Sequence, residues 1–75
     1  PLVSENLEVN ETFQLSNREI EVLEQLSKGL TYTTIAENLT ISPSTVRRHT
    51  ENIYKKLQVH SKIEAIELAK KNRIL

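Results

Sequence analysis

The side chains best suited to chemistry are four charged residues within one stretch, residues 43–57. Arg47, Arg48, Glu51 and Lys55 recur at spacings that place them on one side of a helix. A guanidinium group can bind guanine O6 and N7, or a phosphate, through two parallel hydrogen bonds. Glu51 can accept a hydrogen bond from a cytosine amino group, or it can orient an arginine one turn away. Because this side of the helix holds no apolar residue, it is predicted either to be a solvated surface or to bind a polar partner.

The stretch that carries these residues has the pattern of an amphipathic helix. Ser42 is a suitable N-cap, and Pro43 fits the first helical position, where no backbone donor is needed. Apolar positions then recur at steps of three and four, which predicts a buried stripe of Val46, His49, Ile53 and Leu57. His49 is expected to be a half-buried, hydrogen-bonded core residue, because a lone histidine makes no metal site.

Two further helices are predicted upstream of this one. Ser16, with Glu19 three residues later, forms the capping box that begins the first of them. Gly29 ends that helix, because glycine adopts the left-handed conformation without a Cβ penalty. Thr31 is the predicted cap of a second, shorter helix over residues 32–39.

The connection between the second and third helices is very short. Only Thr40 and Ile41 lie between the end of the second helix and Ser42. A tight turn between two short helices is typical of the helix-turn-helix motif, whose second helix enters the major groove of DNA. The helix over residues 43–57 is therefore the predicted reading helix.

A fourth helix is predicted over residues 61–71. Ser61 and Glu64 have the spacing of a second capping box. The inward positions are Ala65, Leu68 and Ala69, and a second, more exposed stripe holds Ile63, Ile66 and Lys70. No segment has a strand pattern. The predicted fold class is all-α: a compact four-helix helix-turn-helix domain, related to winged helices but without a wing.

The composition excludes several classes of function. There is no cysteine and no aspartate, and the single glycine excludes a glycine-rich phosphate loop. No Ser–His–acid set is placed by spacing, so we expect no enzyme activity, no cofactor, no metal and no small-molecule ligand in this domain. No apolar run approaches the roughly 20 residues of a membrane span, and no signal peptide is visible. A cytoplasmic protein with no membrane partner is expected.

The zero formal net charge hides an uneven distribution. Residues 1–38 carry seven acidic and two basic side chains, whereas residues 39–75 carry three acidic and eight basic ones. Local field attracts phosphate more directly than total charge does, so the second half can still offer a basic surface. The alternative interpretation is that this uneven distribution of charge is random and has no function. Residues 1–14 are predicted to be an acidic linker or arm of a longer protein, and residues 15–75 the domain.

Spaced motifs over residues 15–75 resemble the LuxR-type helix-turn-helix domain. They are Arg18-Glu19, Gly29-Leu30, Ile35-Ala36, the run from Ser42 to His49, and Lys56-Leu57 followed by Glu64-Ala65. Five blocks in this order are far more specific than a single helix-turn-helix pattern. The family forms the C-terminal part of bacterial transcription regulators, behind a receiver or a ligand-binding domain. The resemblance implies a cytoplasmic output domain, most readily that of a two-component response regulator.

The resemblance also implies roles for particular residues. The base-reading positions of the family match Arg47, Arg48 and Glu51. Its contacts to the DNA backbone match Thr33, Thr34, Ser44, Thr45 and Lys55, and we add Lys56 beside them. The dimer face of the family, on the helix over residues 61–71, matches Ile63, Ile66, Glu67 and Lys70. Double-stranded DNA and a second copy of the chain are the implied partners, with only weak pairing of the isolated domain.

The sequence departs from the family pattern at three places. Gln58 stands where glycine usually follows the Lys-Leu pair, and a left-handed backbone there costs about 1 kcal/mol. Thr34 replaces a longer polar residue, and Glu51 replaces the lysine of some relatives. The change at Glu51 leaves the base preference open. Glu51 can contact a base directly or orient a neighbouring arginine, and the second role is slightly favoured.

Two other functions fit the same features. The domain can be a protein-interaction module that packs on RNA polymerase or on another regulator, which the neutral charge and Glu51 favour. A sigma-factor-like promoter reader is the third, although the Glu64-Ala65 block fits the LuxR-type pattern better.

Overall fold

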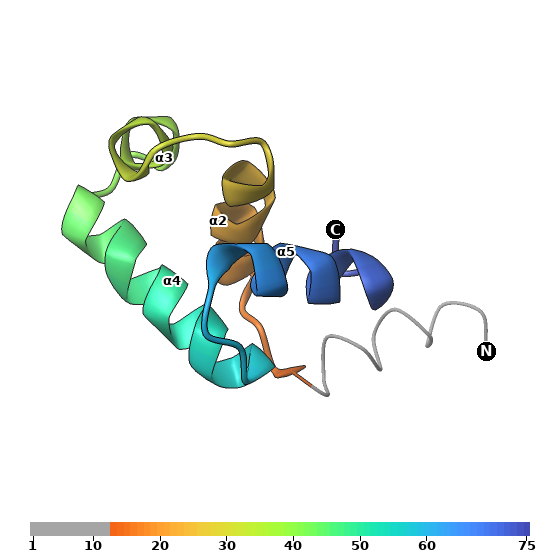
Figure 1. Cartoon of the computed structure of the whole chain (residues 1–75). Helices are drawn as coiled ribbons and strands as arrows, with labels where there is room; N and C mark the ends of the chain where they lie inside the picture. Colours follow the sequence, from red (N-terminus) through yellow and green to blue (C-terminus); the bar gives the residue numbers. More distant parts are fainter. Residues whose placement is uncertain (1–12) are drawn as a thin grey trace.

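The structure is a computed structural model, and it describes residues 13–75 as four helices (Figure 1). These are α2 (Asn17–Ser27), α3 (Tyr32–Leu39), α4 (Pro43–Leu57) and α5 (Lys62–Lys71). The described part of the chain contains no strand, so the predicted all-α class is confirmed. All four predicted helices are present. The predicted linker falls mostly on residues 1–12, which lie outside the described residues; Phe13 is half-buried and packs on the core.

Local side-chain bonds begin the helices where the sequence predicts. The Glu19 N–H donates to Ser16 Oγ at 3.1 Å, and the Ser16 N–H donates to Glu19 Oε1 at 2.9 Å, which completes the first capping box. Thr31 accepts from the Thr34 N–H in the same way, and Ser42 accepts from the Thr45 N–H. Each cap satisfies a donor that the first turn of a helix leaves free.

The second predicted capping box, at the start of α5, is only half formed. The Glu64 N–H donates to Ser61 Oγ at 3.2 Å, as expected. The Glu64 carboxylate, however, accepts from the His60 N–H at 2.8 Å, one residue before the cap. Ser61 has a φ of −148°, which is more extended than the three other N-caps. The carboxylate therefore closes the turn around His60 instead of the cap residue.

Helix α4 is the central element of the fold, and it packs against α2, α3 and α5 (Figure 1). The side of α4 that faces the core carries Val46, Ile53 and Leu57, all of them buried. His49 is half-buried on this stripe, as expected, but its side chain forms no hydrogen bond within residues 13–75, so the prediction of a hydrogen-bonded histidine is wrong. The polar residue that is fully buried on this side is Thr50, which is 1% exposed. Residues 49 and 50 both fit a helical repeat. Thr50 can be buried because its hydroxyl donates to the Val46 carbonyl at 2.9 Å.

Small and branched side chains fill the space between the helices. Ala36 on α3 and Ala65 and Ala69 on α5 are buried, and each lets its helix approach a neighbour closely. Val22 and Leu23 of α2 complete the same apolar core. This core is what holds the outward side of α4 in a fixed orientation.

Three helices end in left-handed residues that are not glycine, and the one after α5 is Arg73, with φ 60°. Gln58 after α4 has φ 58° and ψ 47°, and Thr40 after α3 has φ 59° and ψ 47°. At the end of α4 the Val59 N–H bonds to the Tyr54 carbonyl at 3.0 Å, and the Gln58 N–H bonds to the Lys55 carbonyl at 3.2 Å. This is a Schellman-type ending, which prefers glycine at the left-handed position. The sequence predicted strain at Gln58 if its backbone were left-handed. The backbone is left-handed there, so the cost of about 1 kcal/mol applies.

We expect Gln58→Gly to stabilise the fold by about 1 kcal/mol, because it removes the Cβ penalty of the left-handed conformation. The free energy of unfolding in urea measures the effect. Gln58→Ala is the control, since alanine loses the same exposed side chain but keeps the Cβ. Equal stability of the glycine and alanine variants would show that the backbone at this position is unstrained.

Candidate nucleic-acid interface

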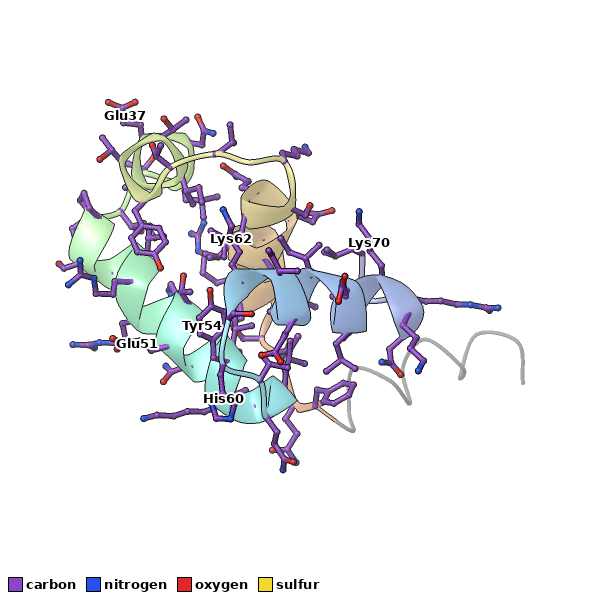
Figure 2. The ribbon with its side chains drawn as sticks, viewed as in Figure 1. Glu37, Glu51, Tyr54, His60, Lys62 and Lys70 are labelled. Atoms are coloured by element: carbon purple, nitrogen blue, oxygen red, sulfur yellow. The ribbon has the colours of Figure 1, made fainter. Side chains whose placement is uncertain are left out.

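The side of α4 that faces away from the core is charged and open. Arg47, Arg48, Glu51 and Lys55 are all exposed. Figure 2 shows Glu51 projecting from α4 on the side away from α5. Among residues 13–75, no hydrogen bond or ion pair occupies any of these four side chains, so both guanidinium groups keep all their donors available.

Glu51 forms no ion pair with either arginine in the structure, contrary to the role that the sequence slightly favoured. Two physical reasons account for this. An arginine four residues before a glutamate has the less favourable order for the helix dipole, and an exposed pair gains little over water. The carboxylate is therefore free to accept a hydrogen bond from another molecule.

Hydroxyl groups surround the first turns of α3 and α4. At α3, Thr34 is half-buried and its hydroxyl accepts from Thr31 Oγ1 at 3.1 Å, whereas Thr33 is exposed. At α4, Ser42 Oγ lies 2.8 Å from Thr45 Oγ1 and 3.1 Å from Ser44 Oγ. The partial positive charge of a helix N-terminus attracts anions. Of the four predicted backbone-contact hydroxyls, those of Thr34, Ser44 and Thr45 bond to cap residues, and Thr33 is exposed without such a bond.

The two lysines in the last turn of α4 have different surroundings. Lys55 is exposed and forms no bond within the described chain. Lys56 Nζ donates to Glu19 Oε1 at 2.7 Å and to the Gln14 carbonyl at 2.9 Å. The basic partner of Glu19 is thus Lys56, 37 residues away along the chain. Lys55 is therefore the stronger candidate for a phosphate contact.

Within residues 13–75, Glu19 is the one charged residue that is buried, with 4% of its surface exposed. Burial alone would raise its pKa. The hydrogen bond and the charge of Lys56, with the bonds from Ser16, outweigh burial and hold the pKa of Glu19 below its ordinary value. The ionised carboxylate thus links the first turn of α2 to the last turn of α4.

Acid is expected to weaken the fold through this group. Because the pKa of Glu19 is lower in the folded state, its contribution to stability is present above the unfolded pKa of about 4.3 and is lost as the pH falls through the folded value. Urea unfolding between about pH 6 and pH 3 measures the slope. In Glu19→Gln this part of the slope should disappear, and an unchanged profile would contradict the assignment.

The predicted dimer face lies on α5. Ile63 is 66% exposed and is the exposed large hydrophobic residue of the described chain. Ile66 is half-buried, and Glu67 and Lys70 are exposed on the same helix. The residues thus form a small apolar patch with a charged rim.

Other kinds of site are not indicated in the part of the chain that the structure describes. Residues 13–75 hold no group of three or more His, Cys, Asp or Glu side chains that could bind a metal ion. His60 is exposed in the turn before α5. None of the four helices has the length and hydropathy needed to cross a bilayer.

Comparison with known proteins identifies relatives of this arrangement. The family model described as "Bacterial regulatory proteins, luxR family" matches residues 13–69. The chain is 44% identical over 61 residues to the fimbriae Z protein of Salmonella typhimurium, covering 81% of this chain and 29% of the relative. It is 40% identical over 73 residues to the oxygen regulatory protein NreC of Staphylococcus haemolyticus, covering 96% of this chain and 34% of the relative.

A solved structure also matches. The response regulator ChrA, from a heme-sensing two-component system, superposes with a TM-score of 0.78 at 43% identity. The match covers 81% of this chain and 30% of that chain. The chain therefore spans well under half of the length of the relatives that it matches.

Proposed function

The chain belongs to the luxR family of bacterial regulatory proteins, and from this premise we propose that it binds double-stranded DNA in a sequence-specific manner. It acts as the output domain of a transcription regulator. The observation that carries the proposal is the two-sided structure of α4, with Val46, Ile53 and Leu57 buried on one side and two unpaired arginines exposed on the other.

The exposed side of α4 suits the major groove of B-DNA. The groove is about 12 Å wide and admits one helix, and its base edges offer the acceptors that a guanidinium group binds. In this proposal Arg47, Arg48 and Glu51 contact bases. The free carboxylate of Glu51 is available to a cytosine amino group, which is a readout that a lysine could not provide.

Contacts to the DNA backbone position the reading helix. The first turns of α3 and α4 offer hydroxyls, and the N–H groups that the caps do not use, to phosphates on either side of the groove. The proposed backbone contacts are Thr33, Thr34, Ser44, Thr45 and Lys55. Lys56 is the weakest member of this set, because its ammonium already holds Glu19 and the Gln14 carbonyl.

A second copy of the chain completes the binding site. One helix makes too few contacts for useful specificity, and helix-turn-helix proteins generally bind two half-sites as dimers. Helix α5 is the proposed contact between copies, through Ile63, Ile66, Glu67 and Lys70. The patch is small, so we expect the isolated chain to pair weakly and to dimerise on DNA.

We propose that this domain belongs to a longer regulator, because the relatives that it matches are about three times its length. Several are response regulators by name, and we infer that this domain is coupled to a receiver through the predicted linker, residues 1–14. Such a regulator works in the cytoplasm, where a bacterium keeps its chromosome. RNA polymerase is a further partner that this role implies.

The salt dependence of binding tests the proposed role of Lys55. Each phosphate contact that is lost reduces the slope of log affinity against log salt by about 1. Lys55→Gln is expected to produce that reduction, measured by fluorescence anisotropy on a promoter fragment. Lys71→Gln, which removes the same charge from the end of α5, should leave the slope unchanged. If the slope of log affinity against log salt is equally steep in Lys55→Gln and Lys71→Gln, Lys55 does not contact a phosphate.

A further inference from the structure

The junction between α4 and the start of the domain contains an unusual three-way contact. The Lys56 ammonium binds the Glu19 carboxylate at 2.7 Å and the Gln14 backbone carbonyl at 2.9 Å. Glu19 belongs to the first turn of α2, and Gln14 lies before that helix begins. One side chain of α4 therefore holds two different parts of the N-terminal segment at once.

The backbone at Gln14 is not in a relaxed conformation. Its φ is 56°, which is the left-handed region, and Gln14 is exposed. A residue other than glycine occupies this region at a cost, so the surrounding contacts must maintain it. Within residues 13–75, the bond from Lys56 to the Gln14 carbonyl is a contact that depends on this conformation.

We propose that Lys56 is a coupling residue through which the backbone conformation of Gln14 controls how firmly the last turn of α4 is held on α2. When Gln14 keeps its left-handed conformation, its carbonyl and Glu19 share the ammonium, and α4 is clamped to α2. When Gln14 leaves that conformation, its carbonyl moves away and the Lys56 ammonium loses one of its two acceptors. The consequence for DNA rests on the proposed function, because α4 is then the reading helix.

The contact is well placed to transmit such a change. Lys56 lies on the same rigid helix as Arg47, Arg48 and Glu51, so a shift of its last turn alters the orientation of the whole reading side. Bonds to a charged group are among the stronger hydrogen bonds in a protein, and the Glu19 side chain that shares this ammonium is only 5% exposed.

Two substitutions at Gln14 separate the conformations without changing Lys56 or Glu19. Gln14→Pro locks φ near −65° and excludes the left-handed state, whereas Gln14→Gly removes the same side chain and allows that state. Amide hydrogen exchange in the absence of DNA is the measurement. We expect exchange in the last turn of α4, at Tyr54 and Leu57, to become about tenfold faster in Gln14→Pro and to be unchanged in Gln14→Gly.

The Ile35 amide in α3 serves as the internal reference, because no residue of α3 takes part in the bonds among Gln14, Glu19 and Lys56. Equal exchange at the end of α4 in the two variants would overturn the proposal. So would a uniform acceleration that includes Ile35 of α3, since that result means general destabilisation. In the Lys56→Met variant, a further Gln14→Pro substitution should not accelerate amide exchange at the end of α4. An acceleration as large as in the unmodified chain would show that Lys56 does not carry the coupling.

A second measurement covers the case in which Lys56→Met does not fold. The Lys56 ammonium protons should exchange slowly with water in the unmodified chain and in Gln14→Gly, and faster in Gln14→Pro; no difference between these variants overturns the proposal. Because none of these readouts uses DNA, they can fail while the chain still binds its operator. Conversely, a chain that binds no DNA but shows the expected exchange pattern would refute the proposed function alone.

Discussion

Replacing both Arg47 and Arg48 by alanine is expected to weaken sequence-specific DNA binding by at least about 30-fold, because each substitution should cost about 1–3 kcal/mol. Both guanidinium groups are exposed and have no partner within residues 13–75, so binding DNA breaks no internal bond. The loss should be larger on the operator than on unrelated DNA, since a bidentate contact to guanine carries sequence information. Gel shifts with both DNA fragments measure the two affinities.

The stability of the domain should not change in the double variant, because neither side chain packs in the core. Arg18→Ala provides the matched control. Arg18 is an exposed arginine on α2 whose ion pair with Glu21, at 3.2 Å, contributes little to stability. DNA binding that is equally strong in all of these variants would contradict the assignment of α4 as the reading helix.

Lys56→Met is expected to destabilise the fold by about 3 kcal/mol at neutral pH. Methionine keeps most of the length of the lysine stem but removes the charge, and the Glu19 carboxylate is then left buried and without its cation. A domain of this size has a total stability of only about 5–10 kcal/mol, so this loss is a large share of it. Urea unfolding measured by circular dichroism gives the value directly.

The neighbouring lysine offers a control in the same turn. Lys55→Met removes an equal charge from an exposed side chain without internal bonds and should change stability by less than about 0.5 kcal/mol. The penalty of Lys56→Met should also shrink as the pH falls toward 4, because Glu19 can then take up a proton. Equal stabilities of the two lysine variants would show that the ion pair has no energetic role.

The sequence by itself was sufficient for the class and order of the helices. The signals that start them act over three or four residues, as in the bond from the Glu19 N–H to Ser16 or from the Thr45 N–H to Ser42. Such bonds form within a single turn and need no tertiary partner, so they can be read from spacing alone. The exposure of Arg47, Arg48, Glu51 and Lys55 followed from the same helical periodicity.

Only the tertiary structure decided which of two equally spaced or adjacent residues takes each role. His49 and Thr50 both fit the buried stripe of α4, and the outcome depends on the packing of the neighbouring helices and on the hydroxyl bond to Val46. Lys55 and Lys56 are chemically identical. The partners of Lys56 lie 37 and 42 residues away along the chain, at positions that the packing of α4 on α2 brings together. Contacts of this range depend on the relative placement of helices, which local periodicity does not contain.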